Sequence, residues 1–149
     1  MMIGMKVQHA KAAFLDRAAV QKLVDRRTRV ALNHAGALVR KIARNSIRPG
    51  RATSRPGQPP RSHTGLLKRF LFYAYDTARR SVVVGPARLN TGDGQAPARL
   101  EYGGQDRRRA RTLRYLPRPY MGPALTAAQP RIADFWSDRT PTTDPGASQ

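Results

Sequence analysis

The densest run of apolar residues in the chain lies between Thr64 and Pro86. Residues 66–75 contain four aromatic side chains, and residues 82–84 are three consecutive valines. Aromatic and β-branched side chains favour strands, and the short polar segment 76–80 predicts a β-hairpin over residues 66–85. Both faces of the first strand are apolar, so we expect this chain to cover one face and a second subunit to cover the other.

A helical pattern precedes the hairpin. Asp16 suits the N-cap position, and the pattern extends to about Ser46, where Pro49-Gly50 ends it. A helix over residues 16–46 spans about 45 Å, so it overhangs a small sheet and predicts contacts beyond its own domain. The residues of its apolar stripe, which includes a histidine that we expect to be packed, are Val20, Leu23, Val24, Val30, Ala31, His34, Leu38 and Ile42.

The segment 48–63 contains four prolines, two glycines and four arginines. This composition cannot build a core, and it predicts an extended basic arm. After the hairpin we expect a turn-rich loop over residues 86–98. A third strand is predicted over residues 112–116, with Leu113 and Tyr115 inward. An amphipathic helix is then predicted from Met121, which Pro130 should kink or split.

These elements predict an α+β fold with a single domain over residues 1–139. The long N-terminal helix packs on a small, mainly antiparallel sheet, with a second, C-terminal helix and a long Pro/Arg-rich loop. Residues 140–149 are polar and contain proline and glycine, so we expect a flexible C-terminal tail.

The net charge of the chain predicts that its binding partners are acidic. The net charge is +19, and the chain contains 23 arginines and 5 lysines. The positive charge is spread through the domain rather than confined to one tail. It predicts attraction to nucleic acid or to an acidic protein surface. The alternative is that many of the arginines are only solvated surface residues.

Several classes of chemistry lack a signal in the sequence. There is no cysteine, the three histidines lie far apart, and no apolar run approaches the roughly 20 residues of a membrane span. No nucleophile elbow, P-loop or metalloprotease motif occurs. The only glutamate, Glu101, is interpreted as a salt-bridge or turn residue. We therefore expect no enzyme, no cofactor, no membrane association and no small-molecule substrate.

Five short motifs occur in a fixed order. They are Gly57–Pro60, His63–Leu67, Val82–Pro86, Leu100–Gly104 and Arg118–Leu125. Together they resemble the neck, tail-completion or minor tail proteins of tailed phages and prophages, over roughly residues 14–139. Tyr120 stands where that family more often has phenylalanine. The basic run 105–111 is not part of the family's pattern.

The resemblance implies a structural protein of the phage head–tail junction. Such a protein, a neck, tail-completion or tail-terminator protein, forms a homo-oligomeric ring, a hexamer or dodecamer, that joins the head connector to the tail. Its expected partners are itself, neighbouring portal or adaptor rings, and tail-tube or terminator rings. Packaged DNA in the lumen is a further candidate partner. The expected location is the virion, and the host cytoplasm during assembly.

The candidate interface residues are arginines of the arm and of the basic run. Arginine pairs with carboxylates in a bidentate manner, which favours it over lysine at acidic surfaces of adjoining rings. The first candidates are Arg51, Arg55, Arg61, Arg107, Arg108 and Arg109. The second candidates, facing either the lumen or a neighbour, are Arg26, Arg27, Arg40, Lys41 and Arg44.

The main alternative is a basic nucleic-acid-binding protein of ribosomal or nucleoid type. The net charge and the arginine-rich loops favour it. However, the aromatic residues lie among apolar neighbours, as in a core rather than an exposed stacking platform. No standard nucleic-acid-binding motif is present.

Overall fold

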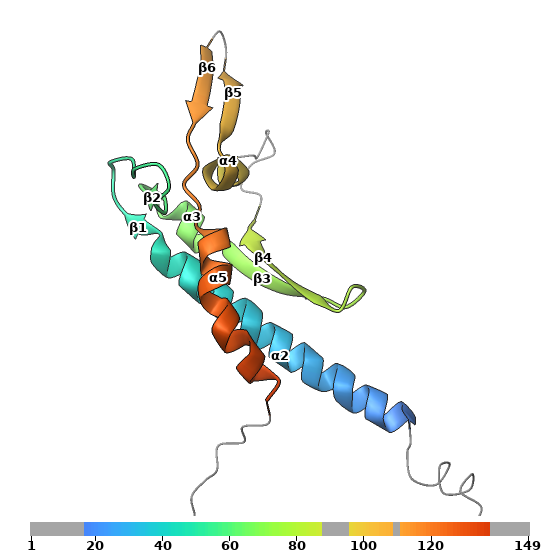
Figure 1. Cartoon of the computed structure of the whole chain (residues 1–149). Helices are drawn as coiled ribbons and strands as arrows, with labels where there is room; N and C mark the ends of the chain where they lie inside the picture. The colour runs from blue at the N-terminus through green and yellow to red at the C-terminus, as the bar shows by residue number, and fades with distance from the viewer. Residues whose placement is uncertain (1–16, 88–95, 109–110, 138–149) are drawn as a thin grey trace, which may run out of the picture.

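The computed structural model describes residues 17–87, 96–108 and 111–137, and it has the predicted α+β fold (Figure 1). Its elements in chain order are α2 (Arg17–Ser46), β1 (Arg48–Pro49), β2 (Arg61–Ser62), α3 (Leu66–Arg69), β3 (Leu71–Asp76), β4 (Ser81–Pro86), α4 (Ala96–Tyr102), β5 (Gly104–Arg108), β6 (Arg111–Tyr115), α5 (Met121–Ile132) and the 3-10 turn η1 (Ala133–Phe135).

The strands form three separate two-stranded sheets in the described part of the chain. β3 and β4 make an antiparallel hairpin in which Tyr73 pairs with Val84, and β5 and β6 make a second one. β1 and β2 are parallel and only two residues long. The strands are therefore mainly antiparallel, as predicted, but they do not join into one sheet.

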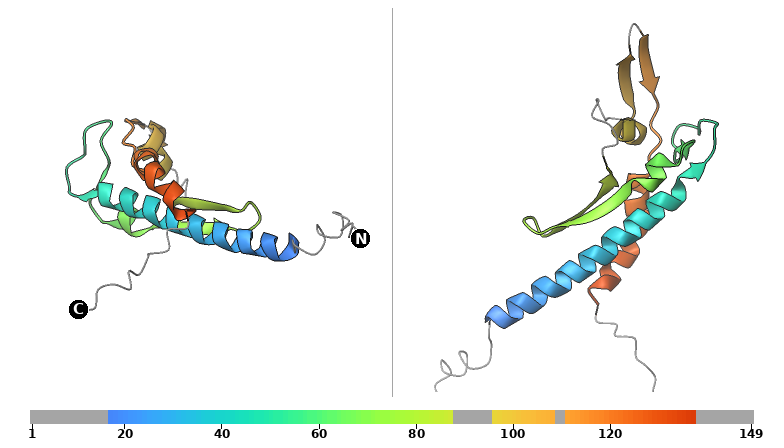
Figure 2. Two further views of the ribbon diagram at one scale, coloured as in Figure 1. Left: turned by 60° about the horizontal axis from the view of Figure 1, so that its bottom comes forward. Right: turned by 180° about the vertical axis from the view of Figure 1, so that it is seen from behind.

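The long helix α2 is confirmed, although its predicted N-cap Asp16 lies outside the described residues. Its C-terminal half packs against α5 and against the β3–β4 hairpin. The hairpin reaches back along the helix to Asp25, which pairs with Arg80, and only the first turns of α2 extend past both (Figure 2). The buried residues of α2 are Ala31, Ala35, Gly36, Val39 and Ala43. The predicted overhang therefore comprises the turns of the helix before Asp25.

The core lies where α2, α5 and the start of β3 meet. Helices α2 and α5 can approach closely because small residues lie between them. Ala43 of α2 and Ala128 of α5 are both completely buried. Three large buried side chains, Ile47, Leu71 and Tyr120, fill the space beside them. Leu38 and Ile42 of the predicted stripe are partly buried against this cluster. His34 is exposed, but its ring contacts that of Phe135 with centroids 5.6 Å apart.

The predicted first strand of the hairpin is wrong at its start. Gly65 has a φ of 73°, which turns the chain, and residues 66–69 form the short helix α3. The strand begins only at Leu71. One face of the hairpin is covered, because Tyr73 and Val82 pack against α2. On the other face the described residues leave Phe72 49% exposed, so its cover by a second subunit stays a prediction.

Two further predictions between residues 86 and 116 were also wrong. The loop predicted over residues 86–98 ends too late, because residues 96–98 already belong to the helix α4, and residues 88–95 lie outside the described residues. The third strand exists as β6, but it pairs with β5 in a separate hairpin, and Leu113 is exposed rather than inward. The chain can leave α4 in this direction because Gly103 and Gly104 both have positive φ. The hairpin consequently projects away from the core (Figure 1).

The last helix begins at Met121, as predicted. Pro130 lies inside α5, which continues for two residues to Ile132 before the chain tightens into η1. Pro130 therefore marks the approach to the helix end and does not split α5, since few hydrogen bonds remain beyond it to be lost. Within the described ranges, no helix combines the length and the apolar character needed to span a membrane.

Candidate functional site

The predicted basic arm is a closed loop. Arg48 pairs with Arg61 and Pro49 with Ser62 in the short parallel ladder of β1 and β2. Gly50 N–H extends the ladder by donating to Ser62 O at 3.4 Å. Residues 50–60, which we call the basic loop, therefore leave and return at the same point. The expectation of an extended segment is corrected by this strand pairing.

A second set of contacts fixes the basic loop to the segment between β6 and α5. Arg118 Nε donates to Ser54 O at 2.9 Å. Gly57 N–H donates to Pro117 O at 2.9 Å. The same segment is held to α4, because Arg118 N–H donates to Leu100 O at 2.6 Å. Ser54 and Pro60 are buried as a result. The loop is thus held at its ends and at its middle.

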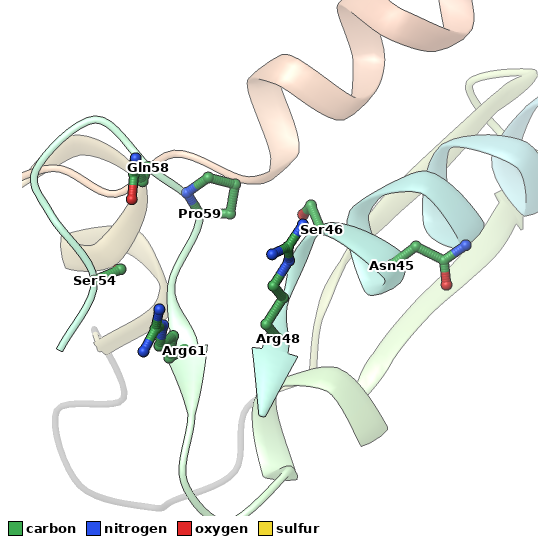
Figure 3. A pocket seen from close by; sticks show the side chains of 7 residues that line it. All are labelled: Asn45, Ser46, Arg48, Ser54, Gln58, Pro59 and Arg61. Carbon is green, nitrogen blue, oxygen red and sulfur yellow. The ribbon is translucent and has the colours of Figure 1, made fainter. Parts of the chain in front are cut away.

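A recess of about 440 Å³ lies between the basic loop and the end of α2 (Figure 3). Its lining residues are Asn45, Ser46, Arg48, Ser54, Gln58, Pro59 and Arg61. Arg48 and Arg61 extend from the paired strands on either side of it (Figure 3). Among the described residues, neither arginine has an acidic partner. The Oγ atom of Ser54 is buried and has no hydrogen-bond partner there. We call this cavity the basic recess.

The structure separates the predicted interface arginines into two groups at one end of the molecule. Arg51 and Arg55 are exposed on the basic loop, and Arg61 lines the recess. Arg107 is exposed on β5. The backbone of Arg108 belongs to β5 but its side chain, like Arg109, lies outside the described residues. Both groups lie toward the end of α2 that is remote from Arg17 (Figure 1).

Arg48 is a recess residue that sequence reasoning missed. Its neighbour Pro49 was interpreted only as the end of the helix. The spacing of Arg48 and Arg61 carries no signal by itself, because the two meet only through the pairing of β1 with β2. The local sequence gives one indication that the two arginines meet. Arg48 directly precedes Pro49-Gly50 and Arg61 directly follows Pro59-Pro60, so each flanks one end of the same loop.

The cations of α2 have different surroundings. Arg40 Nε donates to Leu71 O at 2.6 Å, and its guanidinium lies 6.0 Å from the centre of the Phe72 ring. Arg40 therefore attaches α2 to β3 instead of facing a partner. The buried Nε of Arg44 has no hydrogen-bond partner among the described residues. Arg26, Arg27 and Lys41 are exposed, so they remain interface candidates.

Glu101 has a structural role as the cap of α5. Its Oε2 accepts hydrogen bonds from the backbone N–H groups of Tyr120 and Met121, and its Oε1 accepts one from Gly122. Burial, followed by the nearby charge of Glu101, raises the pKa of Tyr120 to about 12. The carboxylate therefore accepts three backbone hydrogen bonds at the start of α5.

An apolar groove of about 460 Å³ runs between α2, β4 and α5. Leu32 and Gly36 of α2, Val82 of β4 and Leu125 of α5 line it. Tyr102 stands at its edge and is 83% exposed. In the described ranges, no group of acidic, histidine or cysteine side chains could hold a metal ion.

Comparisons with protein-family models, with curated proteins and with solved structures found no match to this chain.

Proposed function

We propose that this protein is a structural virion protein of the phage head–tail junction. It forms a homo-oligomeric ring that joins the head connector to the tail, as a neck, tail-completion or tail-terminator protein. The five ordered motifs of the sequence support this proposal, and so does the shape of the folded chain. The observation that carries it is the overhang of α2, which the described part of the chain leaves without an apolar partner.

The overhang carries apolar residues on the same side of the helix as the covered face, from which Arg27 separates them. Ala31 is buried and His34 contacts Phe135, so α5 and η1 cover this face up to that point. Before it, Val20, Leu23 and Val24 recur on the same side, and Leu23 is 58% exposed. A cluster of exposed apolar side chains of this kind is typical of an interaction surface. A ring provides a neighbouring subunit at this position in every copy.

The opposite end of the molecule supplies a surface of different chemistry. Arg51 and Arg55 are exposed there on the basic loop, and Arg107 is exposed on the projecting β5. An apolar stripe at one end and a basic surface at the other suit a protein that contacts its own copies and also an acidic neighbouring ring. Packaged DNA in the lumen is the remaining candidate partner for the cations.

The test is the assembly state of a variant in which the stripe is polar. We choose Leu23→Gln with Val24→Gln, because glutamine keeps a good helix propensity. The wild-type protein should elute as a large oligomer, or assemble with a phage partner, without nucleic acid. The variant should elute as a small species with an unchanged thermal midpoint. Ala18→Gln, on the opposite side of the same half of α2, is the matched control and should assemble normally.

Two results would overturn the proposal. A lower thermal midpoint in the dilute Leu23→Gln/Val24→Gln variant, with assembly unchanged, would show that the chain's own residues cover the stripe. A wild-type protein that stays small with every phage partner, and binds DNA with a steep salt dependence, would favour the nucleic-acid-binding alternative. The observation that favours this alternative is the projecting β5–β6 hairpin, on which Arg107 and Arg114 are exposed.

A further inference from the structure

We infer that residues 3–7 of a neighbouring copy of this chain add a third strand to the free edge of β4. The added strand fills the apolar groove between α2, β4 and α5. Copies of the chain would thus hold one another by strand exchange. That the exchange closes a ring rests on the proposed function, whereas the groove and the free edge are features of the chain itself.

The outer edge of β4 has backbone groups that point away from β3. Ala87 N–H donates to Phe70 O at 2.9 Å, which extends the β3–β4 ladder by one pair. Hydrogen-bonded pairs alternate in an antiparallel ladder, so Val83 bonds to β3, whereas Val82 and Val84 direct their N–H and C=O groups to the opposite edge. Within the described ranges, no other backbone group bonds to these groups. An edge of this kind is a template for another strand.

The apolar groove lies along this edge. Val82 and Val84 line it from β4, and Leu125 lines it from α5. Val82 faces α2, because a Cβ atom on Gly36 would lie 2.6 Å from Val82 Cγ2. The groove has a volume of about 460 Å³, and Leu125 is 48% exposed at its wall. A strand added to β4 would therefore direct every second side chain into an apolar space.

A short segment that precedes α2 has the residue pattern of such a strand. Three apolar residues, Ile3, Met5 and Val7, alternate with glycine, lysine and glutamine. Strict alternation of apolar and polar residues is typical of a strand with one covered face. The segment lies before Arg17, the first residue that the structure describes. Its three apolar side chains match the apolar lining of the groove.

The free edge of β4 favours one register for the added strand. When the segment runs antiparallel to β4, Met5 lies opposite Val84. Val7 then lies opposite Val82, and each of these pairs exchanges two hydrogen bonds. The apolar side chains of the segment enter the groove, since directly opposed residues point to the same face. Pairing ends at Pro86, the last residue of β4, which has no N–H group.

The reach of the segment favours a neighbouring copy over the same chain. Gly36, which lies against Val82, is 19 positions after Arg17 in α2, or about 28 Å along the helix. The groove also lies to the side of the helix axis, which lengthens the path. The ten links from Val7 to Arg17 span at most about 33–36 Å. Docking in the same chain would therefore need residues 8–16 to be almost fully extended, whereas a neighbouring copy can approach the groove directly.

The experiment introduces cysteine pairs into the full chain, which contains no cysteine of its own. Met5→Cys with Val84→Cys places the two thiols on directly opposed residues, whose Cα atoms would lie about 5.5 Å apart, within the range for a disulfide. The matched control is Met5→Cys with Val83→Cys. Val83 is adjacent in the sequence and is 60% exposed, but its side chain lies on the other face of the hairpin.

We expect mild oxidation of the Met5→Cys/Val84→Cys protein to give a ladder of covalent dimers and larger species on a denaturing gel. The control should form about tenfold less of these species, because its thiols meet only by random collision. A mixture of the two single variants, Met5→Cys and Val84→Cys, should form a covalent heterodimer. The mass of the joined peptides identifies this heterodimer.

A second pair of variants tests the apolar face of the segment without a cross-link. Ile3→Asp with Met5→Asp should weaken self-association by more than about tenfold, because two apolar side chains leave the groove. Gly4→Asp with Gln8→Asp makes the same charge change on the other face of the segment and should weaken it by less than about twofold. Sedimentation at a series of protein concentrations measures both effects. These variants change no residue of the described fold, so the test holds even if Val84→Cys fails to fold.

Three outcomes would overturn the inference. A disulfide between Met5→Cys and Val84→Cys within single chains would place the segment in its own groove. Equal cross-linking in the Val83→Cys control would show that the segment does not select the groove face. Equal weakening of self-association by the two aspartate variants would assign their effect to net charge.

Failure of the proposed function gives a different result. Cross-linking of Met5→Cys to Val84→Cys between copies, with normal joining of heads to tails by the Ile3→Asp/Met5→Asp variant, would retain the strand exchange and contradict only its role at the junction. Loss of assembly in Leu23→Gln/Val24→Gln without any cross-link between the cysteine variants would retain the ring and overturn the strand exchange.

Discussion

Glu101 Oε2 accepts a hydrogen bond of 3.0 Å from the backbone N–H of Met121, a residue 20 positions later in the chain. The same oxygen accepts from Tyr120 N–H at 2.9 Å, and Oε1 accepts from Gly122 N–H at 2.8 Å. The first N–H groups of a helix have no partner within it, and the helix dipole favours a negative charge beside them. One carboxylate on α4 therefore provides the cap that α5 lacks locally and connects the two helices.

Replacing Glu101 by glutamine should destabilise the fold. Glutamine has one acceptor oxygen where glutamate has two, so at least one N–H at the start of α5 would face an amide NH₂ group. We expect the free energy of unfolding to fall by about 1–3 kcal/mol. Urea unfolding should show a lower midpoint with an unchanged m-value. Asp134→Asn, which removes an exposed acidic charge after the end of α5, is the control and should have little effect. An equal midpoint shift in both variants would contradict the capping role.

The raised pKa of Tyr120 predicts a loss of stability at high pH. Burial is the main cause of its value of about 12, and the charge of Glu101 adds to it. The phenol of the unfolded chain ionises near pH 10, whereas the folded protein keeps its proton until about pH 12. The stabilisation is therefore fully present below pH 10 and disappears between pH 10 and 12. Its size is about 2–3 kcal/mol, from the difference between the two pKa values.

The comparison that isolates this effect is Tyr120→Phe, which cannot ionise. The difference in unfolding free energy between the wild type and the variant should be constant below pH 10. Between pH 10 and 12 the wild type should lose stability relative to the variant. Other tyrosines and lysines titrate in both proteins and cancel in the difference. Parallel stability curves across this range would show that Tyr120 ionises equally in the folded and unfolded chains.

Local patterns in the sequence predicted the two main helices well. The stripe from Val20 to Ile42 and the Pro49-Gly50 stop define α2 without reference to the rest of the chain. The strand was predicted to begin at Leu66, but a short helix begins there instead. Gly65 has a left-handed backbone conformation that turns the chain, and the leucine and aromatic residues after it give no sign of this turn. Backbone geometry at one glycine outweighed the β propensity of the residues that follow.

The candidate site was harder to predict because it depends on contacts between distant residues. The basic recess needs the pairing of Arg48 with Arg61 and the contact of Arg118 with Ser54, residues 64 positions apart. The cap on α5 similarly joins Glu101 to Tyr120, 19 positions later. Composition identified the basic loop as unusual, but only the fold brings its serine and arginines together. Charge counting alone favoured Arg51 and Arg55, which lie outside the recess.

The contact between α2 and the β3–β4 hairpin has no room at Gly36. A Cβ atom there would lie 2.6 Å from Val82 Cγ2 and 3.0 Å from Tyr73 Cδ2. Alanine favours helices over glycine by about 1 kcal/mol, but valine is stiff and the hairpin would have to move. We expect Gly36→Ala to lower the free energy of unfolding by about 1–3 kcal/mol. Adding Val82→Ala should recover part of the loss, and a simple gain in stability in Gly36→Ala would contradict the close approach.

The β5–β6 hairpin should act in assembly and not in folding. Its register pairs Gln105 with Arg114 and Arg107 with Thr112, so the two arginines share one face of the hairpin. Both arginines are exposed, and the hairpin projects from the core (Figure 2). Replacing Arg107 and Arg114 by serine should therefore leave the free energy of unfolding within about 0.5 kcal/mol of the wild-type value. Any functional loss can then be assigned to contacts outside this chain.

If those contacts are acidic surfaces of an adjoining ring, Arg107→Ser with Arg114→Ser should impair the joining of heads to tails. Arg79→Ser with Arg131→Ser makes the same charge change at exposed positions elsewhere and should join heads to tails normally. The two double variants separate a local interface from the general effect of net charge, because both lower the charge equally. Head-to-tail joining is measured by counting complete particles and free heads in lysates. Normal joining together with a large, salt-dependent loss of DNA affinity would instead assign this face of the hairpin to nucleic acid, because phosphate contacts dominate such binding and add to its salt dependence.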